Sequence, residues 1–225
     1  ALFEIGPVFL PVEGRALPEE PKRLAIGLWG AKDLPTWTEK ESAWMDFYDL
    51  KGIIEGLIQG LHLREVPFQP LSDHPTFHSG KAALILAGET AIGVMGEIHP
   101  LVRQNYDFLD GAILAAELYL DQIISLVEKG FHVRPISSFP AMVEDIALIV
   151  DEEVPASQVE SLIRKAGGKL LVGARLFDLY RGEKLGVGKK SLAYQLTYQA
   201  FDRTLGVADA AAIRKKIVKL LGFEI

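Results

Sequence analysis

Apolar and polar residues alternate most strictly in the stretch 189–199. Large apolar side chains fill every second position there, and small or polar side chains fill the positions between. This period of two indicates a strand with one face in the core. The stretch 176–182 also alternates, and the glycine-containing loop between the two predicts a β-hairpin. The apolar set is Leu192, Tyr194, Leu196 and Tyr198, and the other set is Ser191, Ala193, Gln195, Thr197 and Gln199.

The elements around this hairpin predict a ferredoxin-like domain. In the hairpin's first strand, Asp178 and Tyr180 alternate with apolar residues, so they should share a face with Ser191. The order of the whole segment is βαββαβ, in which two helices cover one face of a four-stranded antiparallel sheet. The other face should be open, and it should include these three residues. The flanking elements are a strand at 145–150, helices at 155–166 and 209–221, and a last strand at 223–225.

The first part of the chain predicts a sheet with helices packed on one face. Strand-like runs follow one another with few helices between, which favours mixed or antiparallel pairing. Apolar residues at three- and four-residue steps predict a helix of about four turns from Met45 onward. Asp121 is expected to cap the last helix of this part. The expected strands are 1–10, 23–30, 66–71, 82–87, 91–96 and 112–120, with shorter helices at 98–106 and 122–128.

The fold class is therefore α+β with two domains. An antiparallel sheet module should occupy 1–130, a linker containing Pro135 should follow at 131–138, and the ferredoxin-like domain should occupy 139–225. The chain opens without Met directly on a strand-like run, so we expect a piece of a longer protein.

Composition favours a cytoplasmic protein without a membrane span. The 225 residues include no cysteine, which excludes disulfides, thiolate metal sites and a cysteine nucleophile, and which fits a reducing compartment. No apolar run approaches the roughly 20 residues that a membrane helix needs.

The net charge of -6 conceals an uneven distribution. From Val133 onward there are 14 Lys and Arg against 11 Asp and Glu, whereas residues 1–132 have 10 against 19. Between Arg175 and Lys219 the balance is 10 basic to 4 acidic residues. A local basic patch on an acidic chain suggests a polyanionic partner, although a solvated basic surface is the simpler interpretation of charge alone.

Two residue pairs suggest chemistry that we do not favour. Asp46 and Asp49 could form a paired-carboxylate site, but acids at a helix start are far commoner. His74 and His78 are four residues apart, but Pro75 argues against one helix presenting both, and no third metal ligand is near. We therefore expect no catalytic residue and no metal site.

The predicted open face has the chemistry of a surface for unpaired bases. Tyr180 offers a ring for stacking, while Asp178 and Ser191 offer hydrogen-bonding groups for base edges. The surrounding cations would attract phosphates without reading sequence. These cations are Arg181, Lys184, Lys189, Lys190 and Arg203.

Several short motifs, in order and nearly from end to end, resemble the C-terminal part of the β subunit of the bacterial phenylalanyl-tRNA synthetase family. Each is short, but their order and spacing together are specific. They are Phe3-Glu4-Ile5-Gly6-Pro7-Val8-Phe9, the run 46–52, Phe77-His78-Ser79-Gly80-Lys81-Ala82, Gly96-Glu97-Ile98-His99-Pro100, Phe139-Pro140-Ala141, the runs 176–182 and 188–192, and Asp202-Arg203-Thr204-Leu205.

The resemblance implies a catalytic-like module of the class II synthetase fold followed by a ferredoxin-fold anticodon-binding domain. It implies a cytoplasmic (αβ)2 tetramer in which the α subunit holds the aminoacylation site, so ATP and Mg2+ belong to the holoenzyme and no cofactor to this chain. It also implies that Asp178 and Tyr180 contact the first anticodon base of tRNA(Phe), with Ser191 in the same pocket. This chain alone should be inactive.

The chain departs from the family pattern at informative positions. Class II synthetases hold ATP with an Arg soon after the Phe of their second motif, but Phe9 is followed by Leu10 and Pro11. The glycine-rich third motif, with its own ATP-binding Arg, has no counterpart. Glu144 stands where the family commonly has a basic residue, which puts a phosphate contact there in doubt. Ser79 replaces the more usual Pro.

Two other functions remain open from the residues alone. βαββαβ domains also serve as regulatory modules that bind amino acids between paired domains, and such modules bury the face that an RNA binder leaves basic and aromatic. Alternatively, Tyr180 packs against a protein neighbour in an assembly module. The basic stretch 175–219 favours RNA.

Overall fold

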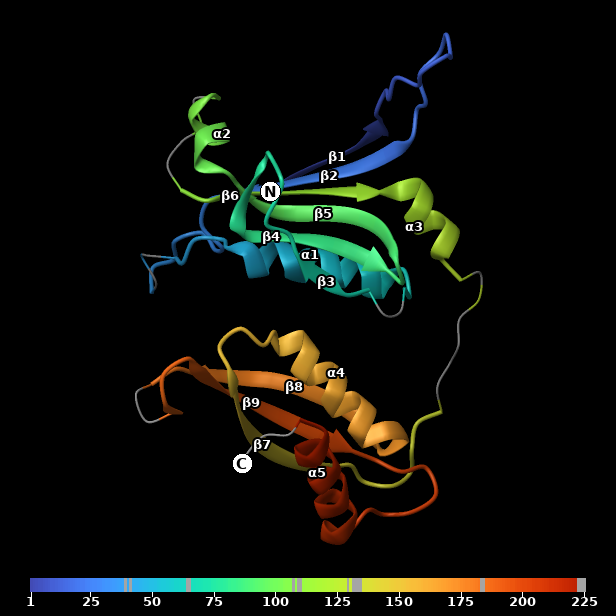
Figure 1. The fold of residues 1–225 in the computed structure, drawn as a ribbon, viewed down its shortest axis with the longest axis vertical. Coiled ribbons are helices and arrows are strands. Elements are labelled where there is room, and N and C mark those ends of the chain that lie inside the picture. The colour runs from blue at the N-terminus through green and yellow to red at the C-terminus, as the bar shows by residue number, and fades with distance from the viewer. Residues whose placement is uncertain are drawn as a thin grey trace. The chain divides into compact units, whose positions relative to one another are not determined.

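The computed structural model describes residues 1–38, 40, 42–63, 66–106, 108, 111–128, 130, 135–182 and 185–221. The chain divides into two compact units, Ala1–Phe131 and His132–Ile225. Each unit has its own sheet (Figure 1).

The first unit is built on a six-stranded sheet with the strand order β1-β2-β6-β5-β4-β3. Every neighbouring pair is antiparallel, as the sequence predicts. Its elements are β1 (Leu2–Pro7), β2 (Lys22–Trp29), α1 (Phe47–Gly60), β3 (Phe68–Pro70), β4 (Phe77–Ala87), β5 (Thr90–Ile98), α2 (Pro100–Gln104), β6 (Ile113–Tyr119) and α3 (Leu120–Leu126).

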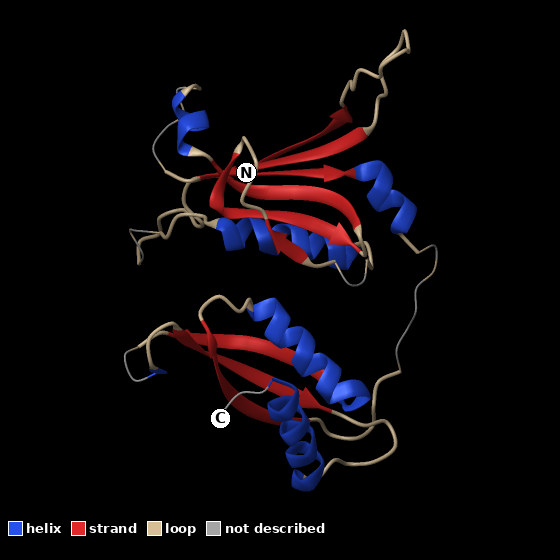
Figure 2. Cartoon of the chain, in the orientation of Figure 1, coloured by secondary structure: helices blue, strands red, loops and turns tan. Residues whose placement is uncertain are grey.

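The core of the first unit lies between the sheet and helix α1. Leu50 and Ile54 of α1 are fully buried, and they pack against apolar side chains of β2, β4, β5 and β6. Figure 2 shows α1 running along one face of the sheet. Asp46 begins this helix with a capping box, because its carboxylate accepts from the Asp49 amide while Asp49 accepts from the Asp46 amide at 2.6 Å. The two acids are thus helix caps.

Helix α3 begins differently from the prediction. It starts at Leu120, and its N-cap Tyr119 makes no side-chain cap hydrogen bond. Asp121 instead accepts a hydrogen bond from the Lys22 amide at 2.8 Å, across to strand β2. The prediction that Asp121 caps the helix is wrong, because this tertiary partner occupies its carboxylate. Strand β4 also begins earlier than predicted, at Phe77.

Close packing requires a glycine at Gly93 in β5. A β-carbon at this position would lie 2.6 Å from Leu118 Cδ2 and 2.7 Å from the carbonyl oxygen of Glu117 on β6. Both distances are shorter than van der Waals contact, and the carbonyl belongs to the backbone. A side chain there would have to push the two strands apart.

The second unit contains a three-stranded antiparallel sheet with the order β7-β9-β8. The described order of elements is β-α-β-β-α, as predicted, and the predicted last strand at 223–225 lies outside the described residues. Its elements are β7 (Met142–Asp151), α4 (Ala156–Gly167), the 3-10 helix η1 (Gly168–Leu170), β8 (Leu171–Tyr180), β9 (Lys189–Tyr198) and α5 (Val207–Leu221).

Helices α4 and α5 cover one face of this sheet (Figure 1). Val159 and Ile163 of α4 and Ile213 of α5 are buried against the even-numbered residues of β9. Among these, Tyr194 is fully buried, and its hydroxyl donates to the Ala156 carbonyl at 2.9 Å. Burial, reinforced by nearby Glu160, raises the pKa of this hydroxyl.

We predict that Gly93→Ala lowers the free energy of unfolding of the first unit by about 1–3 kcal/mol, because the added carbon overpacks the β5–β6 contact. Gly56→Ala is the matched control. That glycine is exposed in the middle of α1 with open space around it, so the same change should stabilise by about 0.5–1 kcal/mol. Urea unfolding followed by tryptophan fluorescence reports this unit selectively, because Trp29, Trp37 and Trp44 all lie in it. Equal stability of the two variants would contradict the packing argument.

Candidate nucleic-acid interface

The face of the second sheet opposite helices α4 and α5 presents its side chains in rows. Because directly paired residues of antiparallel strands point to the same side, the register defines each row. We call this side the open face. Its first row is Tyr180, Ser191 and Ile149, its second is Asp178, Ala193 and Ala147, and its third is Arg175, Gln195 and Asp145.

A β-bulge in β8 brings Asp178 and Tyr180 onto the open face. Leu176 pairs with Tyr194, and Asp178 pairs with the next residue of β9, Ala193, so Phe177 is the extra residue. Without this extra residue the alternation set by Leu176 would turn Asp178 to the helix side. The sequence predicts the correct face for Asp178, Tyr180 and Ser191, but it does not reveal the bulge.

Tyr180 is half exposed, and the hydroxyl end of its side chain lies against Gly182. A β-carbon at Gly182 would be 2.2 Å from the Tyr180 hydroxyl oxygen. Glycine at this position therefore leaves room for the phenol ring in its present orientation. The ring stands at the end of the open face where β8 leads into the β8–β9 loop.

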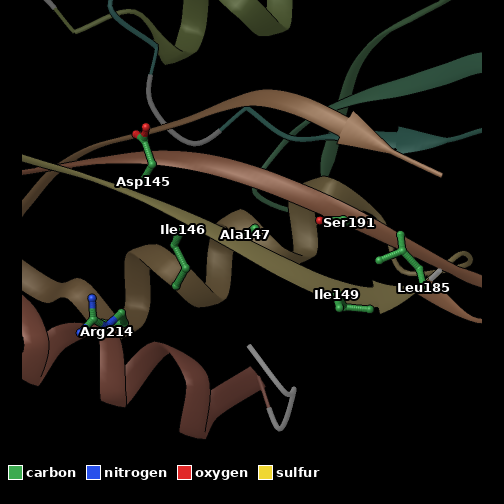
Figure 3. A pocket seen from close by; sticks show the side chains of 7 residues that line it. All are labelled: Asp145, Ile146, Ala147, Ile149, Leu185, Ser191 and Arg214. Atoms are coloured by element: carbon green, nitrogen blue, oxygen red, sulfur yellow. The ribbon is translucent and has the colours of Figure 1, made fainter. Parts of the chain in front are cut away.

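A pocket of about 470 Å³ lies along β7, the strand at one end of the described sheet order. Figure 3 shows Asp145 pointing away from the helices while Ile146, the next residue, points toward them. The pocket volume lies within the range of small-ligand sites. The lining residues are Asp145, Ile146, Ala147, Ile149, Leu185, Ser191 and Arg214.

Arg181 is held by Glu152. The guanidinium Nε donates to both carboxylate oxygens of Glu152, at 3.0 and 3.1 Å, and a second nitrogen donates at 2.6 Å. This hydrogen bonding lowers the pKa of the Glu152 carboxyl. Both side chains are about half exposed, so the pair is a surface clamp between the end of β8 and the turn after β7.

Lys190 is buried, and the expectation that it belongs to the exposed cations is wrong. It precedes Ser191 in β9, so its side chain points to the helix side, where only 8 % of the residue is exposed. Its ammonium donates to the Glu152 carbonyl at 2.6 Å. Lys190 therefore has a structural role. Its side chain is buried because it occupies an even position of β9, like Leu192, and these positions face the helices.

Arg203 also lies away from the first row. From the loop before α5, its guanidinium contacts Asp202 at 3.4 Å and Asp209, in the first turn of α5, at 3.3 Å. Backbone hydrogen bonding from Gly206, helped by Arg203, lowers the pKa of Asp209. Ser191 and Tyr198 are seven residues apart in β9, a separation of roughly 23 Å. Arg203 follows Tyr198 in the chain, so it comes after the end of β9 that lies opposite to Ser191.

Of the remaining predicted cations, Lys189 is exposed at the Ser191 end of β9, and Lys184 lies outside the described residues. Glu144 points to the helix side and forms an ion pair with Arg214 of α5. A residue at position 144 therefore faces away from any ligand on the open face, which accounts for an acid being acceptable there.

The alternative sites in the first unit have structural roles. His74 Nδ1 accepts from the Thr76 amide at 3.3 Å, and His78 Nδ1 accepts from the Gly80 amide at 3.0 Å. In the part of the chain that the structure describes, no three His, Cys, Asp or Glu side chains are grouped to hold a metal ion. None of the described helices is long and apolar enough to cross a membrane.

The alternation in β9 predicts the face of Gln195, but the sequence alone assigns no function to the third row or to Ala147. The strand pattern of 145–150 contains the signal for Asp145, Ala147 and Ile149, because alternate residues share a face. Arg175 could not be assigned in this way, since the bulge interrupts the alternation between it and Asp178.

Comparison with known proteins assigns both units to families. Residues 1–120 match the family model described as the phenylalanyl tRNA synthetase beta chain CLM domain. Residues 137–224 match the model described as the ferredoxin-fold anticodon binding domain, which agrees with the predicted fold class.

Curated relatives match nearly the whole chain. The phenylalanine–tRNA ligase beta subunit of Clostridium tetani is 40% identical over 98% of this chain and 26% of the relative. That of Symbiobacterium thermophilum is 37% identical over 100% of this chain and 25% of the relative. That of Clostridium acetobutylicum is 34% identical over 98% and 26%. This chain spans about a quarter of the length of these relatives. By these matches it belongs to the phenylalanyl-tRNA synthetase β chain family.

Proposed function

We propose that this chain is the C-terminal part of a phenylalanine–tRNA ligase β subunit and that its open face binds the anticodon loop of tRNA(Phe). The observation that supports the proposal most is the shared face of Tyr180, Asp178 and Ser191, which depends on the bulge. Family membership and the anticodon-binding description of residues 137–224 support it as well.

The three side chains divide the recognition of one base. Tyr180 offers its ring for stacking, which contributes roughly 1–3 kcal/mol per base. The Asp178 carboxylate accepts hydrogen bonds, as from N1 and N2 of guanine, and the Ser191 hydroxyl donates or accepts beside it. Ala193, which lies between Ser191 and Gln195 on the open face, leaves the base room to approach the sheet.

Lys189 attracts phosphate groups. Arg181 attracts them with the side of its guanidinium that does not face Glu152. Lys190 does not take part, because its ammonium is bound to the Glu152 carbonyl. Arg203, which comes after the opposite end of β9, would attract phosphates of other nucleotides. These contacts carry no sequence information and weaken with salt.

The first unit acts as a scaffold that binds the α subunit in an (αβ)2 tetramer. Its β1 strand supports this role. Phe3 and Ile5 pair with core residues of β2 and therefore lie on the core face of the sheet, but they are 75% and 58% exposed. Obligate interfaces cover such apolar surface. The unit lacks the ATP-binding Arg after Phe9, so ATP, Mg2+ and catalysis belong to the α subunit. The protein works in the cytoplasm.

We predict that Asp178→Ala removes most of the preference for guanine at the first anticodon position. Tyr180→Ala should weaken binding of every loop by roughly 5- to 150-fold, because stacking is blind to sequence. Fluorescence anisotropy with the 225-residue chain and anticodon stem-loop RNAs measures both effects. Val143→Ala, on the same face but beyond the third row, is the control.

If Asp178→Ala and Tyr180→Ala fold normally and bind every loop as the unchanged chain does, the open face is not the reading surface. An assembly role for this face would then take its place.

We predict opposite behaviour of the two neighbouring lysines. Lys189→Ala should weaken RNA binding and reduce the slope of log affinity against log salt by about 1, because one phosphate contact is lost. Lys190→Ala should leave that slope unchanged and lower the free energy of unfolding by roughly 1–3 kcal/mol, because the Glu152 carbonyl loses its charged donor. Salt titrations of binding and urea unfolding separate the two. A slope change in Lys190→Ala alone would refute the assignment.

We predict that replacing Phe3 and Ile5 together by Ser weakens association with the α subunit of a bacterial phenylalanine–tRNA ligase at least tenfold, because two apolar anchors are lost. The chain's stability should hardly change, since both side chains are already exposed. Leu34→Ser, at a loop residue that is 87% exposed, is the control. Titration of α with each variant measures the effect, and unchanged affinity in the double variant would exclude β1 from the interface.

A further inference from the structure

The third row of the open face is a polar unit that the proposed binding of the first base does not use. Gln195 stands in the middle of the row, with Asp145 on one side and Arg175 on the other. Gln195 is half-buried, and its two neighbours are exposed. Three hydrogen-bonding side chains thus lie side by side on three different strands.

The row has a defined hydrogen-bonding direction. The Gln195 amide nitrogen donates to Asp145 Oδ1 at 3.4 Å, a long hydrogen bond that orients the amide. The amide nitrogen of Gln195 is thus directed to Asp145, which leaves its amide oxygen as the acceptor of this side chain, and the Arg175 guanidinium on the neighbouring strand contains only donors. An acceptor therefore stands beside a donor along this row.

This pattern matches one class of base edge. On their Watson–Crick edges, adenine and cytosine place an amino donor next to a ring-nitrogen acceptor, whereas guanine and uracil place a carbonyl acceptor next to a ring N–H donor. The amide oxygen of Gln195 can accept from the amino group while Arg175 donates to the ring nitrogen. In the major groove of DNA, a glutamine amide both accepts from the adenine amino group and donates to a ring nitrogen; here Arg175 would replace the amide nitrogen as the donor.

The spacing of the rows suits a neighbouring nucleotide. Gln195 is two residues from Ala193 in β9, so the third row lies roughly 6.8 Å beyond the second. The first base occupies the first and second rows, and the next base of an extended strand would reach the third. In Figure 3, Asp145 is separated along β7 from Ala147 and Ile149, at the opposite end of the pocket from Leu185.

We propose that Gln195, oriented by Asp145 and assisted by Arg175, reads the second anticodon base and selects a base that places an amino group next to a ring-nitrogen acceptor. The inference rests on the proposed anticodon binding by the open face. It fits tRNA(Phe), because phenylalanine codons have uracil at the second position and the anticodon therefore has adenine there.

The test measures binding of the 225-residue chain to stem-loops that differ only at the second anticodon base, by fluorescence anisotropy. The unchanged chain should prefer adenine over uracil by roughly 5- to 150-fold. Gln195→Leu should reduce this ratio to below about twofold while it keeps the preference for guanine at the first position. Asp178→Ala should do the reverse. Thr197→Val, one row farther along β9, is the matched control and should keep both preferences.

Arg175→Met is a second variant, for use if Gln195→Leu does not fold by circular dichroism. It should weaken all loops and lower the adenine preference at least threefold. If both folded variants keep the full adenine preference while Asp178→Ala loses the guanine preference, the third-row assignment is wrong and the proposed function stands. If no variant, Asp178→Ala included, alters either preference, both are wrong.

Discussion

One extra residue in strand β8 determines which side chains the second sheet presents. Phe177 has no partner in β9, and the pairing therefore shifts between Leu176 and Asp178. Arg175 and Asp178 are three residues apart, an odd spacing that would place them on opposite faces of a regular strand. The bulge brings them to the same face. The stacking ring, the carboxylate and the guanidinium of the open face all depend on it.

The bulge is followed by a clamp at the Tyr180 end of the sheet. Glu152 contributes three of its groups there. Its carboxylate holds Arg181, its carbonyl accepts from Lys190, and its amide donates to the Gly188 carbonyl at 2.8 Å. These bonds join the turn after β7 to both strands of the β8–β9 hairpin. Tyr180 and Ser191 are thus held at a fixed spacing where the hairpin would otherwise be least constrained.

Much of this arrangement could be predicted from the sequence, because alternation and helical periodicity report burial directly. The helix from Phe47, the hairpin and the face of Ser191 follow from the pattern. Asp46 and Asp49 were correctly interpreted as helix-start acids, since capping depends only on neighbours in sequence.

The wrong predictions concern two kinds of residue. Some have hydrogen-bond partners that are distant in sequence, and others were assigned by their charge and not by their position in the strand. Lys190 was grouped with the surface cations by its charge, although its even position in β9 assigns it to the buried side. Asp121 bonds to Lys22, 99 residues away, and no local pattern indicates this. The bulge itself arises from pairing between two strands, which the alternation of either strand alone does not reveal.

The second row of the open face carries only small side chains at its β7 and β9 positions. Ala147 and Ala193 place only a methyl group above the backbone, between the taller side chains of the rows on either side. Nothing larger stands over β7 and β9 in this row, so a flat ligand can approach the sheet beside the Asp178 carboxylate. Both positions face away from the core formed with α4 and α5, so the room for a ligand and the stability of the domain are governed by different sets of residues. Selection can therefore reshape what this surface accepts without weakening the fold that displays it.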